Sequence, residues 1–433
     1  MKETTKRTVT IVTIIISLLP CLLLLHYPVT PTTASVTLWV SAVVGYMGIV
    51  LLLWMYILGT KSTMSLIYGD LAPVLKIHKW LGKYGTIAIF LHPILITLSY
   101  GESWLYSIIP QTTTVADRHI LLGQIAFWIL IATWALSAFL RGKIAFRPWK
   151  YLHYLAYICV PFALLHVPDL GSQESQYVKV KAYFFALVLT YLVFVLLRAR
   201  SLFNLDKTAY IISRHVKLTD EDYMVQLTPQ GNRHIAPKSG QYVYIKLGYL
   251  SEDHPFSVTQ YDEQTGIITL AYREAGMYTR EMMKLQESQQ VLLSGPYGTF
   301  TADLPADDTR PVIYISGGIG ITPFVDRIMR ESDTREQWLF AANRTRPLAV
   351  LYAPLKQRLG NRAVATYSRD MSELGPNEEH GYITYDLLVK YVTEPTKYTY
   401  YICGPQRMID SMTSMLRDNG IARTAIHSEE FAW

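Results

Sequence analysis

The sequence predicts a multi-domain fold: a six-helix transmembrane bundle, then an antiparallel β-barrel, then an α/β domain with a doubly wound sheet. Charged residues make up 17% of the 433 residues, yet they are scarce before about residue 200. Six long apolar stretches lie in that first part. Beyond it, short alternating strands give way to strands that alternate with helices. We therefore expect domains at 1–200, 201–305 and 306–433.

The overall charge does not predict a polyanionic partner. The formal net charge is +6, but many Lys and Arg residues flank apolar stretches, where they set the orientation of a membrane protein. We therefore expect no nucleic-acid binding. The three cysteines, Cys21, Cys159 and Cys403, lie far apart without a C-x-x-C pair, so the sequence predicts neither a disulfide framework nor a zinc site.

The apolar stretches approach the roughly 20 residues that span a bilayer. They cover residues 8–26, 36–59, 79–100, 119–140, 150–168 and 181–198. The first follows the basic segment Met1–Arg7 and precedes Thr33-Ala34-Ser35, a pattern similar to a secretory signal peptide. Because Thr8–Leu25 exceeds the roughly 7–15 residues of a signal-peptide core, we expect a retained membrane helix.

The distribution of Lys and Arg predicts the orientation in the membrane. Basic residues precede the first apolar stretch, separate the second from the third and the fourth from the fifth, and follow the sixth, whereas residues 27–35 and 101–117 contain none. Lys179 is a mild exception that Asp169 and Glu174 offset. By the positive-inside rule, we expect a multi-pass protein of the cell membrane with both termini in the cytoplasm.

Four histidines lie in two of these predicted helices, which run in the same direction. His78 and His92 are fourteen residues apart and His153 and His166 thirteen, so the two steps rise about 21 Å and about 20 Å. One imidazole from each helix at each level would give two bis-histidine sites, and haem iron with two axial protein ligands suits electron transfer. The alternative is that each histidine only hydrogen-bonds a neighbouring helix.

Only one of the two steps places its two histidines on the same face of an ideal helix. A step of fourteen falls about 40° short of whole turns, whereas a step of thirteen is off by about 140°. Pro161 lies between His153 and His166, and a proline can kink or rewind a helix. His26 and His119 lie at outer helix ends without matching partners. Each could be an interfacial residue or could line an acceptor site.

The barrel is predicted from short alternating segments broken by Gly, Pro and Asp. They are Ala209–Val216, Tyr223–Thr228, Gln241–Leu247 and Ile267–Tyr272. Within the barrel, His254-Pro255-Phe256-Ser257 opens a strand, where backbone groups and a hydroxyl could meet a flat polar ring. An ordinary turn and strand start is the alternative for this segment.

A second barrel motif favours a phosphate. Gly276-Met277-Tyr278-Thr279 precedes a predicted helix at Arg280–Gln286, whose N-terminal N–H groups favour a pyrophosphate. Arg273 and Arg280 could add positive charge.

Two turns mark the α/β domain as nucleotide-binding. The strand Val312–Ser316 runs into Gly317-Gly318-Ile319-Gly320-Ile321-Thr322-Pro323, where glycines let the backbone approach phosphate, Thr322 is placed to cap a helix and Pro323 suits its first position. A plain strand-to-helix turn is the alternative. The strand Tyr398–Cys403 ends in Cys403-Gly404-Pro405, at the sheet edge where open α/β sheets bind ligands.

Two residues near these motifs have two interpretations each. Cys403 is either buried packing or a neighbour of a nicotinamide ring. Phe431, in the terminal segment Glu430-Phe431-Ala432-Trp433, either packs on the domain or stacks on a flavin.

Together these motifs resemble the ferric reductase and NADPH oxidase superfamily, most closely its single-chain bacterial NADPH oxidases, over nearly the whole chain. The resemblance implies two haems b, the inner one held by His78 and His153 and the outer one by His92 and His166. It also implies a ferredoxin-reductase-like module with FAD and NAD(P)H. In that module the segment His254–Ser257 binds the isoalloxazine, the turns at Gly317–Pro323 and Cys403–Pro405 hold NAD(P)H, and Phe431 lies beside the flavin.

The implied reaction is hydride transfer from the nicotinamide to flavin N5, followed by single-electron transfer to the inner haem, the outer haem and an acceptor. The residues expected at the reacting atoms are Ser257, Cys403 and Phe431. The leading acceptor is O₂, which gives superoxide. A ferric chelate, or a partner protein outside the cytoplasm, is the alternative, and no obligatory protein partner is evident.

The dinucleotide preference depends on the segment Phe340–Arg346, which reads FAANRTR. It keeps Arg344 and Arg346 but has Ala342 where NADPH-selective relatives often have Ser. We expect NADPH as the donor, and use of NADH as well stays open.

Overall fold

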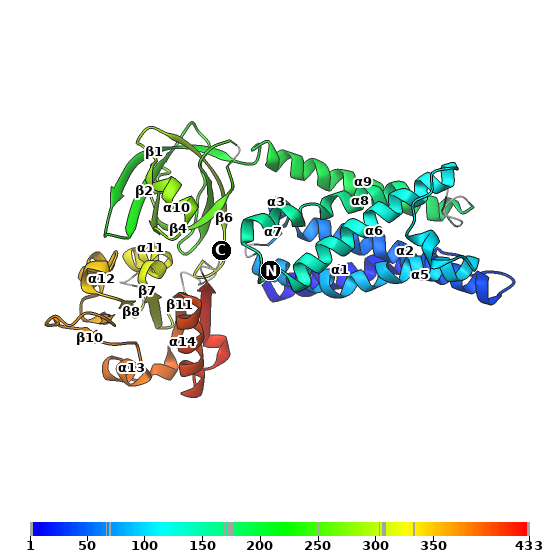
Figure 1. Ribbon diagram of the computed structural model, residues 1–433. Helices are drawn as coiled ribbons and strands as arrows, with labels where there is room; N and C mark the ends of the chain where they lie inside the picture. Colours follow the sequence, from blue (N-terminus) through cyan, green and yellow to red (C-terminus); the bar gives the residue numbers. More distant parts are fainter. Residues whose placement is uncertain are drawn as a thin grey trace. The chain divides into compact units, whose positions relative to one another are not determined.

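The computed structural model describes residues 3–65, 67–68, 71–168, 170, 173, 176–249, 251–302, 304, 309–331 and 334–430. The chain forms two compact units, Met1–Leu205 and Asp206–Trp433. The first unit is helical and the second contains the strands (Figure 1). We describe each unit by itself.

The first unit is a bundle of apolar helices. Its α-helices are α1 Glu3–Leu23, α2 Thr33–Leu58, α3 Lys61–Met64, α4 Ala72–Trp80, α5 Thr86–Tyr100, α6 Val115–Phe139, α7 Phe146–His153, α8 Ala156–His166 and α9 Val178–Leu202. Among the described residues, five helical stretches are long and apolar enough to cross a membrane: Thr5–Leu23, Thr33–Leu58, Pro73–Tyr100, Val115–Phe139 and Val178–Leu202. Each matches one of the predicted spans.

The span predicted at 150–168 differs, because the structure divides it into α7 and α8. The chain turns more tightly between them, where the N–H of Tyr157 donates to the carbonyl of Tyr154 and that of Ile158 to Leu155, both at 3.0 Å. The 11 residues of α8 extend about 16 Å, too short to span a bilayer alone. The interruption lies before α8, and Pro161 lies inside α8.

A second irregularity separates α4 from α5. Leu81–Gly85 forms a π-helical turn, in which each hydrogen bond encloses one more residue than in an α-helix. His78 lies before this turn and His92 after it. The fourteen-residue step therefore does not follow the ideal periodicity of 3.6 residues per turn.

The second unit begins with the predicted antiparallel barrel. Its strands are β1 Thr208–Lys217, β2 Asp222–Pro229, β3 Tyr242–Lys246, β4 His254–Tyr261, β5 Ile268–Arg273 and β6 Gln290–Tyr297. They close in the order β1-β2-β5-β4-β3-β6. Alternate residues such as Tyr210, Ile212, Val225 and Leu227 fill the interior, as the alternating pattern predicts.

A six-stranded parallel sheet follows, which confirms the predicted α/β domain. Its strands are β7 Val312–Gly317, β8 Gln337–Asn343, β9 Ala363–Tyr367, β10 Glu378–His380, β11 Thr399–Gly404 and β12 Ile426–Glu430. The spatial order is β10-β9-β8-β7-β11-β12, so the direction of winding reverses between β7 and β11. Helices α11 Thr322–Glu331, α12 Tyr352–Leu359, α13 Tyr385–Tyr391 and α14 Gln406–Asp418 cover the sheet.

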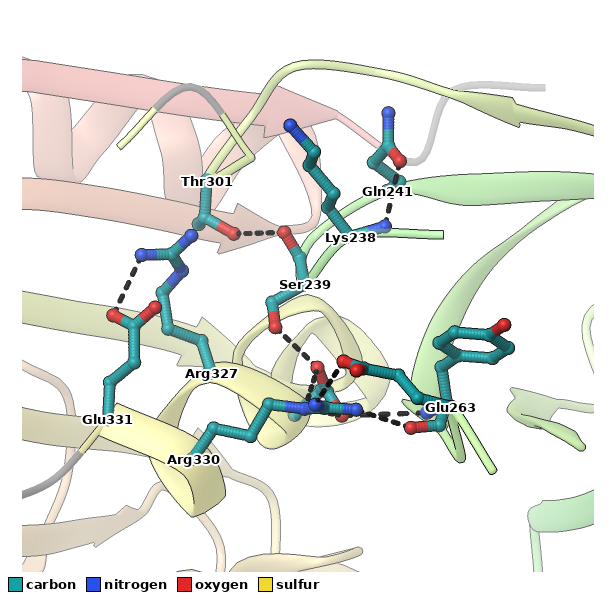
Figure 2. Close-up of polar contacts among 10 residues, drawn as sticks. Lys238, Ser239, Gln241, Glu263, Thr301, Arg327, Arg330 and Glu331 are labelled. Carbon is teal, nitrogen blue, oxygen red and sulfur yellow. Dashed lines mark hydrogen bonds and ion pairs between the residues drawn. The ribbon is translucent and has the colours of Figure 1, made fainter. Parts of the chain in front are cut away.

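Polar contacts join the barrel to α11 (Figure 2). Ser239 Oγ donates to the buried carboxylate of Asp326. Arg330 donates to Asp326 at 3.0 Å and to Glu263 at 2.7 Å, and also to the carbonyl of Tyr261. These bonds hold the sheet against the barrel within this unit.

Candidate cofactor sites

The four membrane histidines meet in two pairs. The ring centres of His78 and His153 are 6.1 Å apart, with the rings inclined at 83°. Those of His92 and His166 are 6.4 Å apart at 84°. A metal ion about 2 Å from each coordinating nitrogen, which lies about 1.2 Å from its ring centre, requires a separation of about 6.4 Å. Each pair therefore has the spacing of two imidazoles that share one metal ion.

One nitrogen of every ring is already hydrogen-bonded. The Nδ1 of His78 bonds the carbonyl of Met55 at 3.1 Å, and the Nδ1 of His92 bonds that of Ser41 at 2.9 Å. Because a carbonyl only accepts, Nδ1 carries the proton in these rings and Nε2 is the nitrogen that can bind a metal.

Of the other two rings, one is bonded to a carbonyl in the same way, and the other to a hydroxyl, which can donate or accept. The Nδ1 of His166 bonds the carbonyl of His119 at 2.8 Å, and the Nδ1 of His153 bonds the hydroxyl of Ser137 at 3.1 Å. Second contacts of this kind orient metal-binding histidines and fix their tautomer. The set of four fits two bis-histidine haems.

Glycines on the facing helices open the space for two of these rings, and a third glycine lies at ordinary contact distance from another ring. A Cβ on Gly45 would lie 2.8 Å from His92 Nδ1, and one on Gly123 would lie 2.5 Å from His166 Nδ1. A Cβ on Gly59 would lie 3.5 Å from Cε1 of His78.

Each of these glycines lies four residues after the residue whose carbonyl accepts the bond. Gly59 follows Met55, Gly45 follows Ser41, and Gly123 follows His119. In a helix, residue i+4 lies directly above residue i, so a glycine there uncovers the carbonyl. The sequence prediction missed these glycines, although their position inside apolar spans was a usable signal.

In the barrel, the predicted flavin segment lies on β4. Val243 pairs with Phe256 and Tyr242 with Ser257 across β3 and β4, and Ser257 is buried. The ring of His254 lies 3.7 Å from that of Tyr278, whose hydroxyl donates to the carbonyl of Ile245.

Tyr278 also stacks near Phe256, at 6.2 Å and 27°. His254, Phe256 and Tyr278 thus form one aromatic cluster. The role of Tyr278 in it was not foreseen, since its signal was only its place in the Gly276–Thr279 motif.

The predicted pyrophosphate helix is displaced toward the N-terminus. α10 covers Met277–Met283 instead of Arg280–Gln286. Thr279 Oγ1 accepts hydrogen bonds from the N–H groups of Ala275 and Gly276, at 3.0 and 3.1 Å. Thr279 therefore organises the turn before this short helix, where the preference of Thr for backbone N–H groups outweighed the predicted helix start.

The two predicted dinucleotide turns contact each other. Cys403 pairs with Ser316 across β11 and β7, so both turns follow neighbouring strand ends, at the reversal of the sheet. A Cβ on Gly317 would lie 2.9 Å from Cδ of Pro405, and one on Gly404 would lie 3.1 Å from the N of Gly317. A Cβ on Gly320 would collide with the carbonyl of Cys403. Only glycines permit this close approach.

The helix after the loop begins differently from the prediction. Gly318–Ile321 forms a 3₁₀ turn, and α11 starts at Thr322 with helical dihedral angles. Thr322 is therefore the first helical residue and not the cap, and Pro323 follows in the second position. The 3₁₀ turn extends the helical stretch toward the N-terminus, so the helix begins earlier than the capping pattern indicates.

Cys403 is completely buried in the core of the α/β domain. Burial, and then the nearby Glu429, raises the pKa of its thiol well above the usual range. Burial therefore favours the neutral thiol over the reactive thiolate. Phe431 lies outside the described residues.

Two predicted arginines are each paired with a carboxylate of the barrel, and one of them lies against the Gly-rich loop. Arg273 binds Asp222 in a bidentate manner, at 2.8 and 2.9 Å, and a Cβ on Gly318 would lie 3.0 Å from its guanidinium. The hydrogen bonds to Asp222 raise the pKa of Arg273 above its usual value, although burial opposes them. Arg344 forms an ion pair with Glu221.

Arg346 takes a different position. It binds Glu378 at 2.5 Å and the carbonyl of Glu373 at 2.9 Å. Arg346 therefore bonds residues of its own α/β domain, whereas Arg344 pairs with a carboxylate of the barrel.

Three family models match successive parts of the chain. "Ferric reductase like transmembrane component" matches residues 44–164, "FAD-binding domain" residues 210–301, and "Oxidoreductase NAD-binding domain" residues 314–414. The first covers three of the four paired histidines, His78, His92 and His153, and ends two residues before His166. The second covers most of the barrel, and the third both dinucleotide turns.

Individual proteins are similar over parts of their length. Ferric reduction oxidase 4 of Arabidopsis thaliana is 22% identical over 311 residues, which cover 68% of this chain and 41% of that protein. Phenol hydroxylase P5 protein of Acinetobacter pittii is 26% identical over 47% of this chain and 60% of its own length. The solved flavohemoglobin of Malassezia yamatoensis superposes with a TM-score of 0.48 at 20% identity, covering 74% of this chain and 99% of that one.

The chain thus spans about half the length of the two curated relatives. An apolar helical region is followed along the chain by a flavin-binding barrel and then by a dinucleotide-binding sheet. This is the order in which the three family models match. The three matches support an NAD(P)H-dependent membrane oxidoreductase, and their combination makes this chain similar to the ferric reductase and NADPH oxidase superfamily.

Proposed function

We propose that this protein transfers electrons from cytoplasmic NAD(P)H, through FAD and two haems b, to an acceptor on the far side of a cell membrane. The observation that carries the proposal is the pairing of four histidines at 6.1 and 6.4 Å, with every Nδ1 hydrogen-bonded. His78 and His153 would hold the inner haem, and His92 and His166 the outer one. Haem held by these pairs would supply one-electron chemistry.

The second unit would supply the donor side. The turns at Gly317–Pro323 and Cys403–Pro405 would receive the dinucleotide, because their glycines bring two backbones together at the reversal of the sheet. Ser257 would hydrogen-bond near the flavin N5, and the cluster of His254, Phe256 and Tyr278 would support the flavin. Cys403 would pack behind the nicotinamide as a neutral thiol, and Phe431 would cover the flavin until the nicotinamide arrives.

The orientation proposed is the one that the basic residues predict, with both termini in the cytoplasm. The inner pair would then face the NAD(P)H side. The proposed domain limits remain 1–200, 201–305 and 306–433.

Two acceptors are proposed. O₂, reduced to superoxide, is the first. A ferric chelate is the second, favoured by the similarity to a protein named ferric reduction oxidase. A relay to a partner protein would use the same path.

Cofactor counting tests the proposal. In purified protein we expect one flavin and two bis-histidine haems b per chain, by a reduced-minus-oxidised absorption spectrum and by quantification of the extracted cofactors. H166A and H153A should each lose one haem. H26A removes a histidine that stacks on Tyr177 outside either pair, and it should retain both. Fewer than two haems in the wild type would refute the architecture.

The acceptor requires a separate assay. NAD(P)H-driven reduction of cytochrome c that superoxide dismutase abolishes indicates O₂ as the acceptor. Reduction of ferric chelates that is insensitive to superoxide dismutase indicates a reductase. Activity with neither, in protein that contains flavin and both haems, favours the relay.

A further inference from the structure

A carboxylate of the barrel forms an ion pair with an arginine at the edge of the sheet where a dinucleotide would bind. Arg344 follows β8 directly, and β8 lies beside β7, which carries the Gly-rich loop. In doubly wound sheets an arginine near this position accommodates the 2′-phosphate of NADPH. Here the Arg344 guanidinium pairs with Glu221. The carboxylate of Glu221 thus pairs with the guanidinium that a 2′-phosphate would require.

Glu221 is fixed in place by its own turn. It lies between β1 and β2, where its N–H donates to Thr219 Oγ1 at 3.2 Å. Its carbonyl accepts from the N–H of Glu274 at 2.9 Å. Because both backbone groups are bonded within the barrel, the barrel determines where the Glu221 side chain meets the α/β domain.

A second arginine approaches the same carboxylate oxygen. The Arg273 guanidinium lies 3.6 Å from Oε2 of Glu221, the oxygen that pairs with Arg344. Arg273 also lies against Gly318 of the Gly-rich loop. One oxygen of Glu221 therefore lies near two guanidinium groups, one from each domain, as an oxygen of a bound phosphate would.

The pair with Arg344 is open to exchange. The side chains of Arg344 and Glu221 are 44% and 35% exposed. Ion pairs with such exposure contribute little, since water and salt screen them. A phosphate dianion offers more charge and more acceptor oxygens than a carboxylate, so it can displace one.

We infer that Glu221 is a specificity-determining residue, which competes with the 2′-phosphate of NADPH for Arg344 and so shifts the dinucleotide preference toward NADH. The inference rests on the proposed oxidation of NAD(P)H by this chain. NADPH must displace Glu221 to reach Arg344, whereas NADH has a 2′-hydroxyl and makes no such demand. Glu221 therefore weakens NADPH binding selectively.

The test compares NADH and NADPH in the full-length, cofactor-loaded protein, with ferricyanide as the electron acceptor. In E221Q, the KM for NADPH should fall about threefold to fivefold, and the KM for NADH should change less than about twofold. R344Q should raise the KM for NADPH alone. In the double variant E221Q/R344Q, loss of Glu221 should have no further effect, because the competed cation is gone.

E263Q is the matched control. Glu263 is also a barrel carboxylate paired with an arginine of the α/β domain, Arg330, at 2.7 Å. Its loss should leave the ratio of the two KM values unchanged. An equal shift for both dinucleotides in E221Q, or no shift, would overturn the inference. If flavin-loaded wild-type protein oxidised neither dinucleotide, the proposed function would fail instead.

Discussion

A Cβ added to Gly123 would lie 2.5 Å from Nδ1 of His166, closer than real Cβ atoms approach any neighbour. The same nitrogen bonds the carbonyl of His119 at 2.8 Å. The ring thus lies between the carbonyl that it bonds and a glycine backbone that leaves room for it.

This contact predicts that G123A displaces His166 and loses the outer haem while the inner haem stays. Haem quantification and redox titration of the purified variant should show one component instead of two. G142A adds the same methyl group where nothing lies within 4 Å, so it should keep both. Two intact haems in G123A would contradict the proposed place of the outer haem.

Ser137 distinguishes the inner pair, since His153 is the one ring of the four whose Nδ1 bonds a side chain and no carbonyl among the interactions described above. S137A should lower the affinity for the inner haem about 10-fold to 100-fold, as losses of such second contacts do. The rate of haem transfer to an apoprotein trap measures it. S137T should restore retention. S99A removes a hydroxyl that bonds only Ile96 of its own helix in the described contacts, and it should behave as wild type.

Asp222 is fully buried and binds Arg273 through both oxygens. In D222N the guanidinium loses its fully buried, bidentate counter-charge and keeps only the more distant Glu221, so the free energy of unfolding should fall by about 3 kcal/mol. Chemical denaturation followed by flavin fluorescence gives the value. D220N affects a carboxylate that is 91% exposed beside Lys217, and it should leave the unfolding curve unchanged. Equal curves for D222N and wild type would show that the pair has no net stabilising effect.

Glu378 makes the α/β domain sensitive to acid. Burial opposes its ionisation, but the N–H of Gly375 and the guanidinium of Arg346 outweigh burial and lower the pKa of Glu378 below its usual value of 4.5. A lowered pKa means that the carboxylate stabilises the fold above about pH 4.5, and that this stabilisation is lost as pH falls through the lower, folded-state pKa.

Thermal unfolding between about pH 6 and about pH 3 should therefore show a steeper loss of Tm at the acid end in the wild type than in E378Q. E287Q removes an exposed barrel carboxylate and should keep the wild-type slope. Identical slopes for E378Q and the wild type would argue against this role of Glu378.

The sequence predicted the parts of the fold that follow from local patterns. The strand of Val312 and Ile313 was foreseen because a strand buried on both faces is continuously apolar. The superfamily, the barrel and the parallel sheet are confirmed. The division of the span at 150–168, and the π-turn at Leu81–Gly85, were not foreseen, because periodicity reports an average helix and hides a single wider or tighter turn.

The contacts that complete the candidate sites were harder to foresee. Glu221 and Arg344 are 123 residues apart, and nothing local in either segment indicates that they meet. The helix at Met277 was misplaced by three residues because Thr279 prefers to bond the turn before it.

The acceptor carbonyls on α2 have a mechanical consequence. Ser41 and Met55 are fourteen residues apart, as are His92 and His78, and both bonds come from this one helix. Helix α2 therefore sets the axial spacing of the two acceptor carbonyls and, with it, the spacing of the two proposed haem levels. Deleting one residue between Gly45 and Met55 would rotate one acceptor by about 100° relative to the other and misalign a level, whatever the lipid thickness around it. The two proposed haem levels therefore constrain the length of α2 between these carbonyls more than they constrain its hydrophobicity.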